Sequence, residues 1–325
     1  MRPPISFEDI SILMPIKNGR EFVESSLLQI SQMARGAEVI IVDDGSTDGS
    51  YEYCVSFASL HRNVSVYKCL GAGICDALNQ GVSIATKNWI ARFDVDDTYQ
   101  LNRLSEQIKV LNKTEAILVF SDYTFYGDGI KALGMMTGGV LNLPTKLSLI
   151  TGRRTPHPSA IFSKKVFLEA GGYLSQDAPA EDLSLWLRMC PLGDFATSEN
   201  SLLNYRLSAS STTLSNRADS IERRNQVLKR YPINSEYFHN LISNLNEVMF
   251  LYSGMRATGN RTALLLLDII RYSSFYGVRI TPTKRLIILR KFMRFQVLIA
   301  CLDILIQAKR RSIFRRKASR STMLL

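Results

Sequence analysis

The stretch Glu38-Val-Ile-Ile-Val-Asp43-Asp44-Gly-Ser-Thr-Asp48 joins a nearly continuous apolar run to a polar turn. Such an apolar run is typical of a parallel strand that is covered on both faces. The Asp, Gly, Ser and Thr residues that follow it are typical of a turn that begins a helix. We therefore expect a strand over 38–43 and a helix that ends near Leu60. Two carboxylates, those of Asp43 and Asp44, would then lie at the end of the strand.

The same alternation of apolar runs and helical patterns continues on both sides of this stretch. Further strands are expected over 10–14, 64–68, 89–93 and 116–125, and helices over 20–33, 73–85, 101–111, 164–170 and 181–189. Strands that alternate with helices predict a doubly wound, mostly parallel α/β sheet with helices on both faces. We expect this domain over 1–215, followed by a helical C-terminal region over 216–325.

Charge is distributed unevenly along the chain. The net charge is +11, and residues 284–325 hold 12 Lys or Arg but one acid, Asp303. The other 283 residues carry 28 basic and 28 acidic side chains. The basic character therefore belongs to the tail and does not indicate a nucleic-acid-binding domain. A hydrophobic content of 46% predicts a globular protein with a substantial core.

Cysteine usage and hydropathy indicate the compartment. The five cysteines are scattered and form no C-x-x-C pair, which favours reduced thiols in a reducing compartment; they are Cys54, Cys69, Cys75, Cys190 and Cys301. No apolar leader with a cleavage site and no run of 18 apolar residues is found, so we expect neither a signal peptide nor a membrane-spanning helix. The expected location is cytoplasmic.

Acidic clusters follow two of the predicted strands, and ligands of open parallel sheets bind at the carboxyl ends of strands. Asp43 and Asp44 could also serve only as helix caps. The run Asp94-Val95-Asp96-Asp97 is different, because three carboxylates in four residues repel one another unless a cation or donors neutralise them. Mg²⁺ and Mn²⁺ bind one or two carboxylates together with substrate phosphates. Asp96 and Asp94 are thus candidate metal ligands, with a solvated acidic turn as the alternative.

Four segments, in order, resemble the family 2 glycosyltransferases, which are inverting enzymes of the GT-A fold. They are Ser11-Ile-Leu-Met-Pro15-Ile-Lys-Asn18, Glu38 to Asp48, Gly73-Ile-Cys-Asp-Ala-Leu-Asn79-Gln-Gly81 and Ile90-Ala-Arg-Phe-Asp94-Val-Asp96-Asp97. Later segments look like bacterial transferases that build surface polysaccharides: His157-Pro158-Ser-Ala-Ile-Phe162, Ala170-Gly-Gly-Tyr173, Glu181-Asp182-Leu-Ser-Leu-Trp186-Leu-Arg188 and Leu203-Asn-Tyr205-Arg206. The resemblance covers about residues 8–215.

This resemblance implies a metal-dependent transfer of a sugar from a nucleotide-sugar, a UDP-sugar above all, to a hydroxyl of a lipid-linked saccharide. Residues 1–97 would form the nucleotide-binding half and 98–215 the acceptor half. Asp44, beside Asp43, would hydrogen-bond the nucleobase in a pocket lined by Pro15. Asp94 would approach the ribose, and Asp96 would bind the Mn²⁺ or Mg²⁺ that bridges the two phosphates.

On the acceptor side, the resemblance makes Asp182 the general base that takes the proton of the acceptor hydroxyl. Glu181, Trp186, Arg206 and His157 are further candidate substrate contacts. Glu181 and Asp182 could instead be favourable charges in the first turn of a helix, and His157 could be a structural turn residue.

Two other functions fit parts of the same sequence. The residues Phe93-Asp94-Val95-Asp96-Asp97-Thr98 match D-x-D-x-T, the motif in which a haloacid dehalogenase phosphatase would use Asp94 as its nucleophile. That motif normally ends the first strand of its fold, whereas three strands are predicted before it here. A non-catalytic nucleotide-sugar-binding module is the other alternative. Many relatives place a His at the position of Ser208, so the third metal ligand is undetermined.

The basic tail suggests a membrane surface as a partner. Residues 285–308 are apolar, and the clusters Lys309-Arg310-Arg311 and Arg315-Arg316-Lys317 follow them. An apolar helix beside a polybasic cluster is typical of peripheral attachment to an anionic cytoplasmic leaflet, at about 1 kcal/mol per basic residue. Two shorter helices packed on the catalytic domain are the alternative. No nucleic-acid partner is expected.

Overall fold

The computed structural model of the chain describes residues 3–33, 36–127, 130–135, 155–206 and 217–231. All of them lie within the unit Met1–Asn234. The predicted boundary at 215/216, Ser208 and the basic tail lie outside the described residues, so the two-part domain division and the tail stay predictions.

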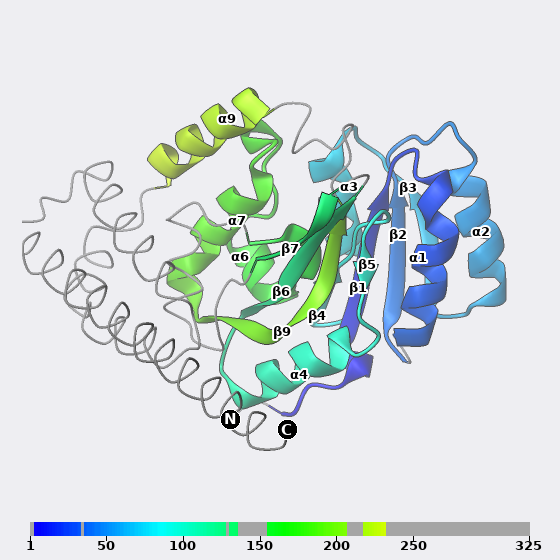
Figure 1. The fold of residues 1–325 in the computed structure, drawn as a ribbon, viewed down its shortest axis with the longest axis horizontal. Coiled ribbons are helices and arrows are strands. Elements are labelled where there is room, and N and C mark those ends of the chain that lie inside the picture. Colours follow the sequence, from blue (N-terminus) through cyan, green and yellow to red (C-terminus); the bar gives the residue numbers. More distant parts are fainter. Residues whose placement is uncertain (1–2, 34–35, 128–129, 136–154, 207–216, 232–325) are drawn as a thin grey trace, which may run out of the picture. The chain divides into compact units, whose positions relative to one another are not determined.

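The described elements follow the predicted alternation closely (Figure 1). The strands are β1 (Ile10–Ile16), β2 (Glu38–Asp43), β3 (Val64–Lys68), β4 (Trp89–Arg92), β5 (Thr98–Tyr99), β6 (Leu118–Gly127), β7 (Ile130–Met135), β8 (Ile161–Ser163) and β9 (Phe195–Arg206). The α-helices are α1 (Arg20–Met33), α2 (Ser50–Leu60), α3 (Ile74–Ile84), α4 (Arg103–Lys113), α6 (Lys164–Glu169), α7 (Glu181–Met189) and α9 (Arg217–Arg230). Short 3₁₀ turns lie at Phe7–Asp9, His157–Ser159, Ser175–Asp177 and Cys190–Leu192.

The first half of the sheet is parallel, as predicted. The order of its strands is β3-β2-β1-β4, and β1 pairs in parallel with both β2 and β4. In this register Ile16 lies opposite Asp43, and Leu13 lies opposite Arg92. The carboxyl ends of β1, β2 and β4 therefore meet at one edge of the sheet.

The second half of the sheet is mixed. The order continues through β8, β6, β9 and β5; β8 is antiparallel to both β4 and β6, whereas β6 and β9 are parallel. The strands β5, β7, β8 and β9 were not predicted, and β5 and β8, with two and three residues, are too short to show a periodic pattern. The α/β fold and its mostly parallel first half are confirmed.

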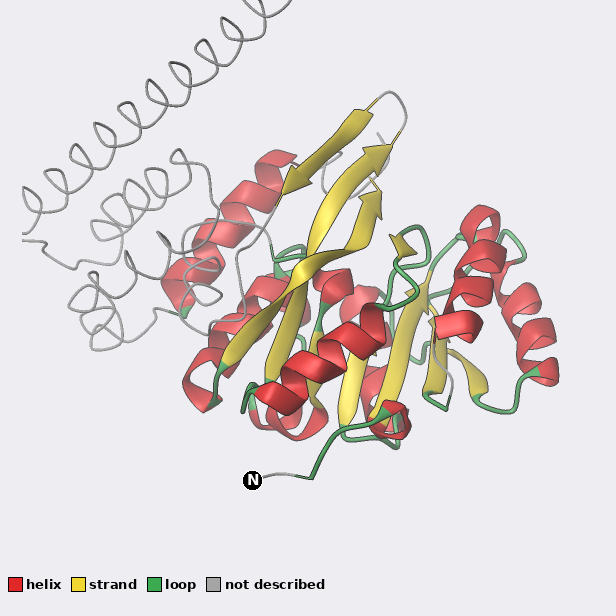
Figure 2. Cartoon of the chain, turned by 60° about the horizontal axis from the view of Figure 1, so that its bottom comes forward, coloured by secondary structure: helices red, strands yellow, loops and turns green. Residues whose placement is uncertain are grey.

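Helices cover both faces of the sheet, as predicted (Figures 1 and 2). Ile12 and Met14 of β1 belong to a buried cluster with residues of α1, α2 and α4. Leu13, which points the other way, meets α3: a Cβ added to Gly81 would lie 2.2 Å from its Cδ1. The glycine thus allows α3 to pack closely on the sheet.

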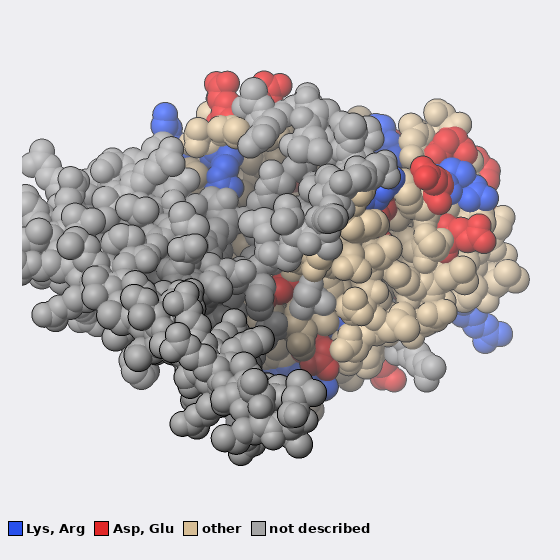
Figure 3. Space-filling view, in the orientation of Figure 1, with Lys and Arg blue, Asp and Glu red and all other residues tan. Residues whose placement is uncertain are grey.

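The described surface and thiols agree with a globular α/β protein. Lys or Arg and Asp or Glu side chains are interspersed on the face that Figure 3 shows. Cys54, Cys69, Cys75 and Cys190 are free thiols. Within the part of the chain that the structure describes, no helix is both long and apolar enough to cross a membrane.

Candidate active site

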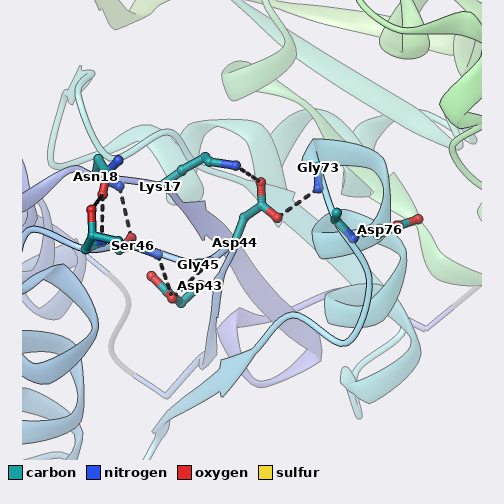
Figure 4. A network of polar contacts seen from close by, with 10 residues as sticks. Lys17, Asn18, Asp43, Asp44, Gly45, Ser46, Gly73 and Asp76 are labelled. Atoms are coloured by element: carbon teal, nitrogen blue, oxygen red, sulfur yellow. Dashed lines mark hydrogen bonds and ion pairs between the residues drawn. The ribbon is translucent and has the colours of Figure 1, made fainter.

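Asp44 lies at the shared edge of β1, β2 and β4, one residue beyond the end of β2 (Figure 4). Its Oδ2 is 3.0 Å from Lys17 Nζ, and its Oδ1 accepts a hydrogen bond of 2.8 Å from the Gly73 backbone N–H. The Asp44 side chain is 10% exposed, whereas that of Lys17 is 60% exposed. The Gly73 N–H thus holds one oxygen of Asp44, while the other pairs with a largely exposed cation, an interaction that is weak in water.

Asp43, the residue before Asp44, has a structural role. It is buried, and its Oδ2 accepts hydrogen bonds from the backbone N–H groups of Gly45 (3.2 Å) and Ser46 (3.1 Å). Asn18 joins the loop after β1 to this turn, since its backbone N–H donates to Ser46 Oγ at 2.9 Å. Pro15 is buried inside β1, opposite Val42. Asp43 thus holds the turn that follows Asp44, and Pro15 is buried in the neighbouring strand.

The acidic run after β4 forms a turn against the loop after β1. Val95 packs on Gly19 so closely that a Cβ added there would lie 2.9 Å from the Val95 Cγ1 atom. The Asp94 side chain is 29% exposed, and its Oδ1 accepts a hydrogen bond of 2.6 Å from Arg92 Nη2. The Tyr99 hydroxyl accepts a hydrogen bond of 2.7 Å from the Asp94 backbone N–H. The Arg92 side chain therefore orients the Asp94 carboxylate, and the Tyr99 hydroxyl holds the Asp94 backbone.

Asp96 and Asp97 differ in what they touch. Asp96 is half-buried, and its carbonyl oxygen accepts a hydrogen bond of 3.0 Å from the Tyr126 hydroxyl. Asp97 is buried, and its Oδ1 accepts a hydrogen bond of 2.7 Å from the Arg206 backbone N–H. Burial, and then the charge of Asp94, raise the pKa of Asp96 and that of Asp97. Asp97 thus ties the acidic turn to the end of β9.

The acidic turn has the chemistry of a divalent cation site. Burial and the charge of Asp94 both disfavour the ionised forms of Asp96 and Asp97, so a bound cation would stabilise these carboxylates. Asp97 Oδ2 is buried without a hydrogen-bond partner. No group of three His, Cys, Asp or Glu ligands gathers within the described ranges. One or two carboxylates with substrate phosphates, the pattern of Mg²⁺ sites, therefore fit these residues better than a complete protein cage.

The Glu181–Asp182 pair begins α7, as predicted. Both residues are half-buried, and Asp182 Oδ1 accepts a hydrogen bond of 2.6 Å from the Leu183 backbone N–H. Burial raises the pKa of Asp182, and burial followed by the charge of Asp182 raises the pKa of Glu181 to about 7. Glu181 Oε2 is buried without a hydrogen-bond partner. Two coupled carboxylates with raised pKa values suit proton transfer near neutral pH.

His157 and Trp186 support this pair from the side. His157 Nε2 lies 2.7 Å from the Tyr173 hydroxyl, and the His157 ring packs on Trp186 at 5.9 Å between centroids. Burial, and then the charge of Arg92, lower the pKa of His157 well below its usual value. Trp186 is 0% exposed. Its ring packs in the core between Phe120 and Phe162, and a contact of Trp186 with substrate stays a prediction.

Arg206, another candidate contact, lies at the end of β9. Its guanidinium carbon is 4.2 Å from the centroid of the Phe22 ring, and its charge lowers the pKa of Asp96. The side chain is half-buried. Arg206 is thus a cation close to the acidic turn, and its contact with substrate stays a prediction.

Arg92 is the site residue that sequence reasoning missed. It is 3% exposed, it pairs with Asp94, and its charge acts on His157 and on the Glu181–Asp182 pair. A signal was available, since Arg92 is the single charge inside the apolar run Trp89-Ile-Ala-Arg-Phe93. A buried charge in a strand requires a partner, and the acidic turn that follows supplies it.

Comparison with protein families agrees with this geometry. The model of glycosyl transferase family 2 matches residues 11–167. GlyG, a glycosyltransferase of Streptococcus pneumoniae, is 32% identical over 123 residues, which are 37% of this chain and 41% of GlyG. The chain thus spans less than half of that relative.

Two further proteins match over more of their length. The Escherichia coli protein WfaP, a UDP-Glc:α-D-GlcNAc-diphosphoundecaprenol β-1,3-glucosyltransferase, is 24% identical over 77% of this chain and 99% of its own. The structure of Staphylococcus aureus TarS 1–349 in complex with UDP superposes with a TM-score of 0.58 at 13% identity, over 88% of this chain and 87% of that one. At this identity the likeness to TarS shows the fold alone.

Proposed function

Because this chain belongs to the family 2 glycosyltransferases, we propose that it is an inverting enzyme that transfers a sugar from a UDP-sugar to an acceptor hydroxyl. One observation carries the proposal. Asp44 follows β2 and the acidic turn 94–97 follows β4, and these two parallel strands flank β1, so both acidic groups lie at the same edge of the sheet. This arrangement supports a site for a nucleoside diphosphate at that edge, with the Glu181–Asp182 pair of α7 as the group that accepts the proton.

The donor is held at the first half of this edge. Asp44, with Pro15 and Asp43 behind it, accepts a hydrogen bond from the nucleobase in place of the Lys17 ammonium. Asp94 keeps its Oδ1 on Arg92 and turns its other oxygen towards the ribose. Asp96 and Asp94 would hold a divalent cation, Mn²⁺ or Mg²⁺, which supplies charge neutralisation for the two phosphates.

The acceptor is activated at the start of α7. Asp182 takes the proton of the acceptor hydroxyl while that oxygen forms a bond to the anomeric carbon of the sugar. The bond from this carbon to the phosphate oxygen breaks, and the nucleoside diphosphate leaves with the electron pair. A single displacement of this kind inverts the anomeric centre. Arg206 lies beside Asp96 and stabilises the leaving group.

The acceptor that the comparisons favour is a lipid-linked saccharide, since the WfaP acceptor is a diphosphoundecaprenol-linked sugar. Such an acceptor lies at a membrane surface. The basic clusters 309–311 and 315–317 would hold the enzyme at the anionic inner face of the cytoplasmic membrane. Synthesis of a bacterial surface polysaccharide is the process that this acceptor serves.

The proposal is tested with a panel of nucleotide-sugars. The purified chain, supplied with Mn²⁺ or Mg²⁺, is expected to hydrolyse or transfer sugar from a UDP-sugar and to leave a simple aryl phosphate unchanged. Release of phosphate from the aryl phosphate would instead support the phosphatase alternative, in which Asp94 is a nucleophile. Tight UDP binding without turnover of any donor would support the non-catalytic alternative.

A further inference from the structure

We propose that Tyr99 and Tyr126 are positioning residues whose hydroxyls hold the main chain of the turn 94–97 in the shape in which Asp94 and Asp96 meet a divalent cation. The inference rests on the proposed function, since it assigns a role at the cation site to two side chains that no motif singled out. Its basis is a set of hydrogen bonds that two separate strands make with the main chain of the turn.

The two hydroxyls hold the turn before and after Val95. The Tyr99 hydroxyl accepts a hydrogen bond of 2.7 Å from the Asp94 backbone N–H and donates one of 3.3 Å to the Asp94 carbonyl oxygen. The Tyr126 hydroxyl donates to the Asp96 carbonyl oxygen at 3.0 Å. A phenol can both donate and accept, so it can bond either group of the main chain. The main chain is thus held over the three residues that carry the two candidate cation ligands.

Hydrogen bonds to the main chain suit a cation site better than hydrogen bonds to its carboxylates. A donor on a carboxylate oxygen competes with the cation for that oxygen, as the Arg92 guanidinium does at Asp94 Oδ1. The bonds from Tyr99 and Tyr126 described above occupy no carboxylate oxygen. A turn that is already ordered also binds the cation without the entropy cost of ordering it. The two hydroxyls therefore favour cation binding without blocking a ligand.

The Tyr99 side chain is itself fixed in place. It is 4% exposed, and its ring centroid lies 4.4 Å from that of Phe93 and 4.7 Å from the guanidinium carbon of Arg103. Its backbone N–H donates to Gln29 Oε1 at 3.0 Å, and its strand β5 pairs with β9. The core thus holds the ring whose hydroxyl bonds Asp94.

Tyr126 holds the other end of the turn from β6. It is half-buried and lies opposite Arg206 in the parallel pairing of β6 with β9. The Arg206 backbone N–H donates to Asp97 Oδ1 at 2.7 Å, so paired residues of β6 and β9 bond neighbouring residues of the turn. The turn is therefore anchored at Asp94 by β5, and at Asp96 and Asp97 by the β6–β9 pair.

The test is the gain in UDP affinity that Mn²⁺ provides, measured for Tyr99→Phe and Tyr126→Phe. Calorimetric titration gives the UDP dissociation constant once with Mn²⁺ and once with EDTA, and the ratio of the EDTA value to the Mn²⁺ value is the gain. Each variant keeps the ring but loses one neutral hydroxyl, which should lower the gain by about 2–10-fold. The dissociation constant in EDTA should stay at the wild-type value, because the nucleobase site at Asp44 is unchanged.

The matched control is Tyr231→Phe, which also removes a hydrogen-bonded hydroxyl, in this case one that donates to Asp177 Oδ2 at 3.3 Å. Its gain should equal that of the wild type. If Tyr99→Phe does not fold, the half-buried Tyr126 still tests the inference.

An unchanged gain in either folded variant would overturn the inference. So would an equal loss of UDP affinity with and without Mn²⁺, because it would indicate a general disturbance of the donor site. A wild type that gains nothing from Mn²⁺ would contradict the cation site of the proposed function, whereas a wild-type gain that the variants keep would contradict this inference alone.

Discussion

The substitution Asp44→Ala tests the nucleobase site. The carboxylate is 10% exposed, so a hydrogen bond that it accepts from the base is screened little by solvent. A hydrogen bond to a charged group contributes about 1.5–3 kcal/mol. Binding must first break the contact with Lys17, which is 60% exposed and contributes at most about 1 kcal/mol. A net loss of about 0.5–3 kcal/mol follows, which weakens UDP binding by roughly 2–150-fold.

The assay is calorimetric titration of UDP into the folded variant in the presence of Mn²⁺. The matched control is Glu52→Gln, which removes an exposed carboxylate of α2 and should leave the dissociation constant unchanged. Circular dichroism verifies that both variants fold. A dissociation constant for Asp44→Ala within about 1.5-fold of the wild-type value would refute the assignment of Asp44 to the nucleobase, since even the smallest net loss is about twofold.

Three further predictions concern stability, the cation and the tail. Asp177→Ala should lower the free energy of unfolding in urea by about 2–4 kcal/mol. The variant loses a fully buried carboxylate, the hydrogen bond of 2.5 Å that it accepts from Ser184 Oγ, and its ion pair with Arg230. A loss below about 1 kcal/mol would contradict this prediction. Chelation by EDTA should abolish transfer and added Mn²⁺ or Mg²⁺ should restore it, whereas a full rate in EDTA would exclude the cation site. Deletion of 309–325 should move the protein from the membrane fraction to the soluble fraction, and an unchanged distribution would count against membrane attachment.

Much of the first half of the fold could be predicted from the sequence. The segments 38–43 and 64–68 are strands with the predicted bounds. The first is a nearly continuous apolar run, as a buried parallel strand requires. The helices over 20–33 and 181–189 also have their predicted bounds, and both begin with an acidic first turn.

The mixed second half of the sheet could not be predicted. β5 and β8 are too short to show any periodicity, and their pairing depends on contacts with distant strands such as β9 and β6. The parallel pairing of β6 with β9 likewise joins segments about 80 residues apart, at Leu118 and Phe195. Local sequence carries no information about such a partner.

The carboxylates of the candidate site could be predicted from the sequence, but the residues that hold them in place could not. Asp44, Asp94 and Asp182 stand out by motif, and their roles stay predictions until they are tested. Arg92 and Tyr99 could be identified only from the structure. The Arg92 side chain pairs with the Asp94 carboxylate, and the Tyr99 hydroxyl accepts a hydrogen bond from the Asp94 backbone. Such contacts depend on geometry that a motif does not encode.

The substitution Asp182→Asn tests the central claim most directly. The amide keeps the size of the side chain but cannot accept the proton of the acceptor hydroxyl, and general base catalysis contributes about 10²–10⁴-fold. We predict that UDP-sugar binds to the variant with wild-type affinity while the rate of transfer falls by that factor. Transfer at a near-normal rate, in a variant that still binds the donor, would contradict the claim that Asp182 is the base of a glycosyltransferase.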